Sequence, residues 1–476
     1  MNDVASNPEP FDSSVLGAAV RDEFPRIVND LGDLVRIPSV AWSAFDPAEV
    51  QRSAEAVARL ARDTGAFSMV DIRRAPVGDG DELGQPAVVA RRDAAPGYPT
   101  VLLYAHHDVQ PPGDRDHWDT EVYEPTLIDG RIYGRGAADD KAGVMAHIGA
   151  IRSLVSVFGD DLRVGIRLFI EGEEEFGSRS FAAFLEQNAD DLEADAIVVA
   201  DSGNWDEQTP GLTVALRGNV TFALTVRTLA HASHSGMFGG AVPDAMLAAV
   251  RTLDTMWDAE GAVAIDGLTR HEADTPDYAS ERLRDEAGLP EGVSEIGRGS
   301  VASRLWFQPS VTVTGINAPS VDQASNTLLP AVTVRVSVRV APGQPAAEAY
   351  AHIRRHLEAN AAFGAQLEFA DVDLGDPFLV DTTGPAVAAI TTAMTSAWGV
   401  EPVELGIGGS IPFIADLVQT FPSAEILVTG VEDPNSRAHS PNESLHVEGF
   451  RKSVTAEALF LAALRARGAD ASAADA

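Results

Sequence analysis

The sequence has 476 residues, of which 45% are hydrophobic and 22% are charged, with a formal net charge of −36 and no cysteine. This length favours two domains over one core, and the negative charge argues against nucleic-acid and anionic-membrane partners because its field repels phosphates. The absence of cysteine excludes disulfides and thiolate ligands, so any metal site must use His, Asp and Glu. The acidity itself has two interpretations, a solvated surface or carboxylates gathered around cations, and only local spacing separates them.

The sequence carries no signal for a membrane or for secretion. No segment approaches the ~18 consecutive apolar residues that a membrane span needs. Residues Met1 to Pro10 are polar and acidic, without the basic and apolar regions of a secretory signal. We therefore expect a cytoplasmic protein.

The first part of the chain alternates helices and short apolar strands. Apolar residues at helical intervals predict helices over Ser13 to Ile37, where Pro38 ends the pattern, and over Ala48 to Asp63. A third helix is expected over Asp140 to Phe158. The expected strands are Ala87 to Arg91, Thr100 to Ala105, Val164 to Ile170 and Ala196 to Ala200. This alternation indicates an α/β fold, a mixed sheet covered by helices on both faces.

From about Leu216 the pattern changes to an α+β unit of two helices on an antiparallel sheet. The strands expected there are Val220 to Arg227 and Val332 to Val340, the helices Val242 to Trp257 and Ala346 to Asn360, and a polar excursion covers Asp258 to Ser300. After about Thr382 the α/β pattern returns and ends in a helix from Val447 to Arg467. We therefore predict one α/β domain, residues 1–216 and 383–476, interrupted by an inserted domain, residues 217–382.

His106 and Asp108 directly follow a predicted strand. Residues at i and i+2 share a face in extended chain, so His106 can ligate a metal while Asp108 accepts the other ring proton. His107 points the other way and is interpreted as structural. The glycine-rich turn Gly134 to Lys141 contains Asp139, which either caps the following helix or projects toward His106 across the strand ends.

Glutamates are concentrated in Glu171 to Ser178, immediately after a buried apolar strand. Four of five neighbouring positions are glutamate, and these charges repel one another unless cations or water screen them. A solvated loop is the alternative, but such loops seldom follow a buried strand. Neighbouring glutamates can divide labour, Glu175 as a metal ligand and Glu174 as general base.

Two further residues complete the candidate set. Asp201 closes a predicted strand, and His439 lies in the loop before the final helix, where a lone histidine is more often a surface residue than a ligand. Two divalent cations are balanced by three carboxylates and a hydroxide, and neutral histidines add ligands without charge. Paired ions of this kind, roughly 3.5–4 Å apart, can clamp a carbonyl and acidify water.

These motifs, taken together and in order over nearly the whole chain, resemble the co-catalytic zinc aminopeptidase-like family. That family includes carnosinases, bacterial dipeptidases, aminoacylases and succinyl-diaminopimelate desuccinylases. The resemblance rests on Ala105 to Pro112, on Gly134 to Gly136 with Asp139 to Lys141, and on Glu174-Glu175 with Gly177-Ser178. The first two look most like the carnosinase and dipeptidase branch.

The resemblance implies two metal ions, zinc before manganese or cobalt, bridged by Asp139. The other ligands would be His106 and Asp201 for one ion, and Glu175 and His439 for the other. Glu174 would deprotonate the bridging water and pass the proton to the leaving amine, while Asp108 orients His106. The family also has a cis peptide bond after the bridging aspartate, so the Asp139-Asp140 bond is expected to be cis.

The inserted domain is similar to the family's lid, and this likeness implies a homodimer. His234 would reach into the partner subunit's active site and stabilise the oxyanion. The residues expected to hold substrate are Asn326, Arg339, Gly409 and Ser410. Arg339 would pair with the substrate carboxylate, a role that suits the guanidinium fork. Without the resemblance, His234 would be interpreted as a surface residue and Arg339 as a cation at a strand edge.

The implied activity is hydrolysis of an amide bond next to a free carboxylate, with small dipeptides as substrates. Deacylation of N-acyl amino acids is the alternative chemistry, and a non-catalytic binding member of the fold is the alternative class. The latter is disfavoured because every ligand and the base are present. Phe176 and Glu173 depart from the family pattern, and no carnosinase-like histidine occurs around Gly375 to Phe378, which leaves the side-chain preference open.

Overall fold

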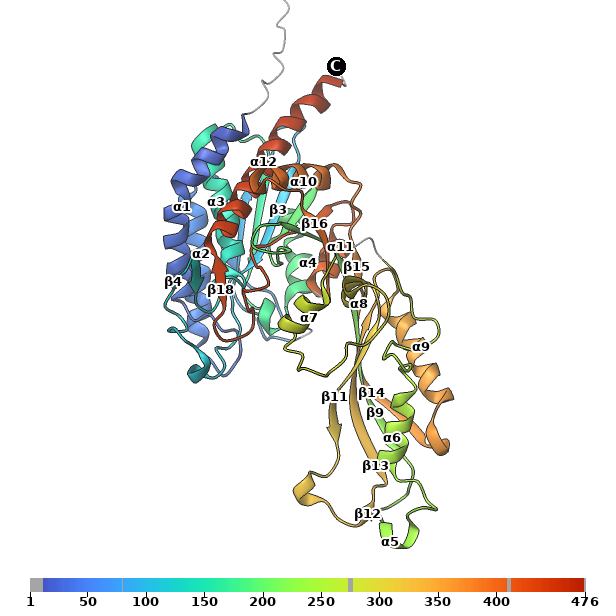
Figure 1. The fold of residues 1–476 in the computed structure, drawn as a ribbon. Helices are drawn as coiled ribbons and strands as arrows, with labels where there is room; N and C mark the ends of the chain where they lie inside the picture. Colours follow the sequence, from blue (N-terminus) through green and yellow to red (C-terminus); the bar gives the residue numbers. More distant parts are fainter. Residues whose placement is uncertain (1–11, 79, 273–276, 409–411, 475–476) are drawn as a thin grey trace, which may run out of the picture. The chain divides into compact units, whose positions relative to one another are not determined.

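The computed structural model describes residues 12–78, 80–272, 277–408 and 412–474. The chain divides into two compact units, one of Met1–Val214, Val380–Glu404 and Asp416–Ala476, and one of Ala215–Leu379 and Leu405–Ala415. Figure 1 shows the ribbon with the helices and strands labelled. Whether the predicted domain boundaries hold in solution stays a prediction.

The first unit is built on a mixed sheet with strand order β1-β2-β6-β3-β7-β17-β8. Its strands are β1 (Met69–Arg73), β2 (Ala87–Arg92), β3 (Thr100–His106), β6 (Gly165–Glu171), β7 (Ala196–Val199), β17 (Glu425–Val428) and β8 (Gly211–Leu216). The strands β6, β3, β7 and β17 run parallel, whereas β1, β2 and β8 are antiparallel to their neighbours. A separate small sheet has the order β18 (Ser444–His446), β5 (Arg131–Tyr133) and β4 (Thr126–Ile128).

Helices cover this sheet. They are α1 (Ser13–Val35), α2 (Pro47–Asp63), α3 (Lys141–Phe158), α4 (Phe181–Leu192), α10 (Pro385–Trp398), α11 (Pro412–Thr420) and α12 (Val447–Ala474). All seven residues of β6 are buried, as expected for a strand covered on both faces. On one face Phe169 stacks on Phe181 and Phe184 of α4, and α3 packs against β3. The predicted α/β architecture is confirmed.

The second unit contains a four-stranded antiparallel sheet of order β11 (Ser310–Asn317), β13 (Ala331–Val340), β9 (Gly218–Arg227) and β14 (Gln366–Gly375). Strict alternation along β9 and β13 buries one face, where Val220, Phe222, Val336 and Val338 pack with apolar residues of α6 (Ala245–Asp254) and α9 (Ala346–Ala359). The predicted pair of helices on an antiparallel sheet is therefore confirmed. The remaining elements are β10 (Ser233–His234), α5 (Ser235–Phe238), α7 (Ser280–Glu286), α8 (Val301–Trp306), β12 (Thr327–Leu328), β15 (Phe378–Leu379) and β16 (Val403–Ile407), which begins in the first unit.

None of the helices in the described part of the chain is both long and apolar enough to cross a membrane.

Candidate metal centre and active site

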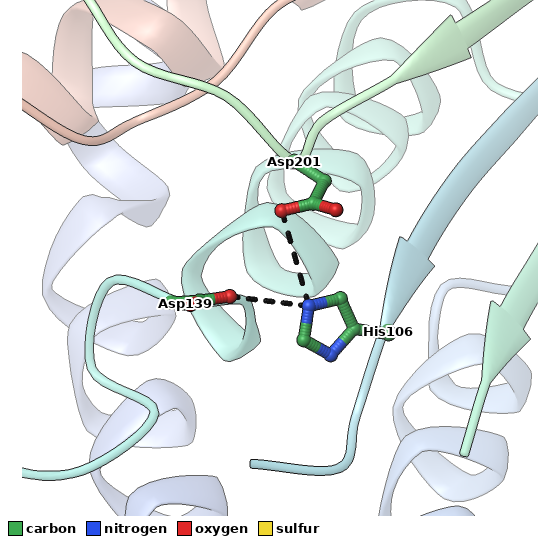
Figure 2. Close-up of side chains that lie close together, drawn as sticks. All are labelled: His106, Asp139 and Asp201. Carbon is green, nitrogen blue, oxygen red and sulfur yellow. Dashed lines mark hydrogen bonds and ion pairs between the residues drawn. The ribbon is translucent and has the colours of Figure 1, made fainter. Parts of the chain in front are cut away.

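His106 ends β3, and the parallel neighbour β7 ends next to it, so side chains that follow the two strands meet at one edge of the sheet. The His106 Nε2 atom lies 3.1 Å from Asp139 Oδ1 and 3.9 Å from Asp201 Oδ1. Figure 2 shows both carboxylates directed at this nitrogen. Asp139 comes from the turn before α3, and Asp201 follows β7. These three residues form the first cluster that could hold a cation.

A second cluster shares Asp139. The His439 Nε2 atom lies 2.9 Å from Asp139 Oδ2 and 3.2 Å from Glu175 Oε2. Each oxygen of the Asp139 carboxylate therefore faces a different histidine. The five residues predicted as metal ligands are brought together as two overlapping triads joined by this one carboxylate.

The chemistry of these triads fits two divalent cations. All the donors are imidazole nitrogens and carboxylate oxygens, which zinc and the neighbouring transition metals accept. Glu175 Oε1 is buried and has no hydrogen-bond partner among the described residues, which leaves it available as a ligand. Hydrogen bonds to Asp139 and Glu175 raise the pKa of His439 to about 11, and burial raises the pKa of Asp201 to about 6. Both shifts indicate that positive charge is favourable among these carboxylates.

Asp108 contacts both the His106 ring and the backbone of Glu174 and Glu175. The His106 Nδ1 atom lies 3.1 Å from the Asp108 backbone carbonyl and 3.4 Å from its carboxylate. The carboxylate itself accepts hydrogen bonds from the backbone N–H groups of Glu174 and Glu175, both at 3.1 Å. Asp108 therefore orients the ring through its main chain, and its side chain holds the short helical turn Glu174–Phe176 in place. The sequence suggested only a contact between the carboxylate and the ring.

Glu174 lies beside the two triads without belonging to either. Its Oε2 atom is 3.9 Å from His106 Nε2. Burial, followed by the charge of Asp201, raises the pKa of Glu174 well above its ordinary value. A carboxyl group with a raised pKa at the rim of a cation site is suited to exchange protons near neutral pH.

The neighbouring glutamate Glu173, in contrast, is a structural residue. Its carboxylate accepts hydrogen bonds from the backbone N–H of Ser180 at 2.8 Å and of Gln85 at 3.1 Å. His107 is also structural, as the sequence indicated, because its buried ring contacts the Pro86 carbonyl at 2.8 Å. The run of four glutamates thus splits into residues that support the loop and residues that face the cluster.

A hydrogen-bond network that the sequence did not reveal holds the backbone of the loop that carries Asp139. Glu443 is fully buried and accepts hydrogen bonds from the backbone N–H groups of Ala138 at 2.9 Å and Asp139 at 3.1 Å. Its other oxygen forms a 2.6 Å ion pair with Arg135. The only sequence signal was an arginine inside a buried glycine-rich turn, which requires a carboxylate from elsewhere in the chain.

The residue that caps α3 is Asp140 and not Asp139, so the alternative role considered for Asp139 was wrong. The Asp140 Oδ1 atom caps α3 through the Gly143 N–H at 3.1 Å, and its Oδ2 accepts from the His106 N–H at 3.1 Å. The peptide bond between Asp139 and Asp140 is cis, as the resemblance implied.

Comparison with known proteins assigns the family. The model of peptidase family M20/M25/M40 matches residues 102–463. A cysteinylglycine-S-conjugate dipeptidase of Corynebacterium striatum is 34% identical over 397 residues, which cover 82% of this chain and 86% of the relative. The chain belongs to peptidase family M20/M25/M40. The resemblance seen in the motifs is thereby confirmed, and the protein is a hydrolase of the metallopeptidase type.

Other M20 relatives agree with this assignment. The human beta-Ala-His dipeptidase is 28% identical over 415 residues, which cover 82% of this chain and 81% of that protein. The crystal structure of human carnosine dipeptidase 1 superposes with a TM-score of 0.74 at 23% identity, covering 96% of this chain and 100% of the other. This likeness confirms the predicted fold.

The inserted unit of this M20 protein carries three further predicted residues, His234 and Asn326 in or beside the two-stranded sheet β10-β12 and Arg339 on β13 of the four-stranded sheet. His234 on β10 is paired with Thr327 on β12, and Asn326 accepts a hydrogen bond from the Ser235 N–H at 3.0 Å, so His234 and Asn326 are neighbours. Arg339 lies near the opposite end of β13, eight residues from Ala331, or about 26 Å along an extended strand. Gly409 and Ser410 lie outside the described residues.

Proposed function

We propose that this chain is a dipeptidase that hydrolyses the amide bond of dipeptides bearing a free carboxylate, with the aid of two divalent metal ions. The observation that carries the proposal is the pair of triads joined by Asp139, because one shared carboxylate between two histidine-containing sites is the arrangement a two-ion hydrolase needs. The M20 relatives named as dipeptidases support the substrate class.

The ligands are proposed to divide between the two ions as the triads do. His106 and Asp201 would hold one, Glu175 and His439 the other, and Asp139 would contact both. Paired divalent cations polarise a carbonyl and acidify water when bound. Zinc is the proposed metal, with manganese and cobalt as alternatives, because all three accept nitrogen and oxygen donors.

Glu174 is the proposed general base and acid. Its carboxylate would take a proton from the attacking water and deliver it to the nitrogen of the leaving amine. Its position beside the His106 ring and its raised pKa both support this role. Asp108 would keep Glu174 at the right distance through the hydrogen bond to its backbone N–H.

The inserted unit is proposed to complete the site from two subunits. Arg339 would pair with the substrate carboxylate, whereas His234 and Asn326 would act in the active site of a partner subunit. The separation of about 26 Å along β13 supports this division, because one dipeptide cannot contact both ends of the strand. We accordingly propose a homodimer, and a cytoplasmic location fits the composition.

A substrate panel tests the proposal. The purified protein is stripped of metal, reconstituted with zinc, manganese or cobalt, and assayed with Cys-Gly, β-Ala-His and a set of N-acetyl and N-succinyl amino acids. We expect turnover of dipeptides that depends on added metal. Preferential turnover of the N-acyl amino acids would replace the dipeptidase assignment with a deacylase, and no turnover of any amide by protein with two bound metals would indicate a binding protein.

A further inference from the structure

Arg217 is a buried arginine that the family motifs do not explain. It immediately precedes β9 in the second unit, and only 9% of its surface is exposed. Its Nε atom donates to the Gly408 carbonyl at 3.1 Å, and its Nη1 atom donates to the Gln308 carbonyl and the Ser310 hydroxyl, both at 3.3 Å. All three acceptors are neutral, so these bonds position the guanidinium without neutralising it.

Strand register places this guanidinium next to Arg339. Arg339 is directly opposite Asn219 on β9 and directly opposite Ser310 on β11. Directly opposed residues on antiparallel strands point to the same face of a sheet, and Arg217, two residues before Asn219, shares that face in extended chain. The apolar side chains of β9 and β13 pack on the other face, so both guanidinium groups lie on the face without the apolar core.

The charge on Arg217 is not matched within the described residues. Burial and then the charge of Arg339 lower the pKa of Arg217 to about 10, and no carboxylate contributes to that pKa. A buried cation beside a second cation is costly unless an anion approaches both. A buried guanidinium that is held by neutral acceptors and lies beside a second guanidinium therefore forms a preorganised site for an anion.

We propose that Arg217 is a specificity-determining residue, which sets its guanidinium beside Arg339 so that the inserted unit presents a paired cationic site to the free carboxylate of the substrate. The inference rests on the proposed function in that Arg339 is taken as the carboxylate-binding residue. Arg217 also ties the Gly408 backbone to Ser310 of β11, the residue directly opposite Arg339.

The test compares the free acid with the amide of the same dipeptide. β-Ala-His, Cys-Gly and their carboxamides are titrated by calorimetry into metal-loaded Glu174→Gln protein, with and without Arg217→Gln. We expect the parent to prefer the acids, and Arg217→Gln to reduce the ratio of acid to amide affinity by about tenfold or more, as for the loss of a charge-assisted contact. Arg335→Gln is the matched control, because Arg335 lies four residues before Arg339 on the same face of β13 and is 43% exposed at its side chain. It should leave the ratio unchanged.

A second variant separates a role in recognition from a role in folding. A Cβ on Gly408 would lie 2.8 Å from Arg217 Nη2, so Gly408→Ala should push the guanidinium aside while Arg217 stays in the chain. Thermal unfolding checks that each variant is folded, and a purely structural Arg217 would weaken acids and amides equally. An unchanged ratio in folded Arg217→Gln or Gly408→Ala protein, or a parent that does not prefer the acids, overturns the proposal. If the parent prefers the acids through Arg217 but the active enzyme cleaves neither dipeptide, the dipeptidase assignment fails and the anion site stands.

Discussion

Glu174 and Asp139 are adjacent in the centre but differ in what they contact. Asp139 faces both histidines, whereas Glu174 belongs to neither triad. We therefore predict that Glu174→Gln keeps a metal content of about two ions per chain while turnover falls by about 100-fold or more, the usual contribution of a general base. Asp139→Ala should lose metal, because it removes the ligand common to both ions. Elemental analysis and steady-state rates measured on the same samples check both, and near-normal turnover by Glu174→Gln would refute the base assignment.

Glu443 shows how a residue outside the cluster can control it. Replacing it with Gln leaves Arg135 buried without its counter-charge and weakens the acceptor for the Ala138 and Asp139 N–H groups. We expect a loss of about 3–5 kcal/mol in the free energy of unfolding, since breaking one partner of a buried ion pair strands the other. Denaturant titration of metal-free protein measures it. The exposed pair Arg354–Glu358 provides the comparison, where Glu358→Gln should change stability by less than about 1 kcal/mol.

The sequence identified the ligand candidates but not what holds them. His106 and Asp201 follow recognisable apolar strands, so their meeting at one sheet edge could be anticipated. The contact between Glu443 and the Asp139 backbone joins positions about three hundred residues apart, so no local sequence pattern could predict it. Arg217 was missed for the same reason, because its acceptors are backbone carbonyls and a hydroxyl brought together only by folding.

At the scale of single elements, the first turn of α3 connects the ligand loop to the sheet. A Cβ on Gly143 would lie 2.1 Å from Asp140 Oδ1 and 2.6 Å from the Ala200 carbonyl. Gly143→Ala should therefore break the cap and shift the Asp139 loop, lowering stability by about 1–3 kcal/mol and weakening metal binding. Gly17 in α1 is the control, because the nearest atom to its added Cβ is 3.7 Å away, and Gly17→Ala should stabilise the helix by about 0.5–1 kcal/mol. Unfolding curves and metal titrations compare the two variants. A Gly143→Ala protein as stable as the parent would contradict the role given to the Asp140 cap in holding the Asp139 loop.

Of the four strands in the antiparallel sheet of the second unit, β9 and β13 were predicted and β11 and β14 were not. β9 and β13 alternate strictly between buried and partly exposed residues, and both were predicted within two residues of their observed starts. β11 and β14 are mostly exposed along their length and were not predicted, although Val311 to Thr314 and Gln366 to Phe369 also alternate apolar and polar residues. The polar excursion over Asp258 to Ser300 contains the helix α7 among its described residues.

At the scale of the whole molecule, the candidate chemistry is distributed between the two units. All five proposed metal ligands and Glu174 belong to the first, whereas the proposed carboxylate-binding residues belong to the second. The second unit is continuous except for the short return segment Leu405–Ala415, which carries Gly408. Because Arg217 bonds to Gly408, the return segment is tied to the rest of the second unit by a side-chain hydrogen bond.

A complementation experiment tests the proposed exchange of residues between subunits. If His234 serves the partner's active site, a heterodimer of one Glu174→Gln chain and one His234→Ala chain contains one intact site, because the first chain donates His234 to the second. Co-expression of the two inactive variants at equal levels should then recover about a quarter of the wild-type activity, since half of randomly paired C2 dimers are mixed and each has one working site. Mixed dimers purified through a different tag on each chain should show about half of the wild-type activity per dimer, because one of their two sites works. If His234 acted within its own chain, each site in the mixed dimer would lack one residue, and the purified heterodimer would remain as inactive as either parent.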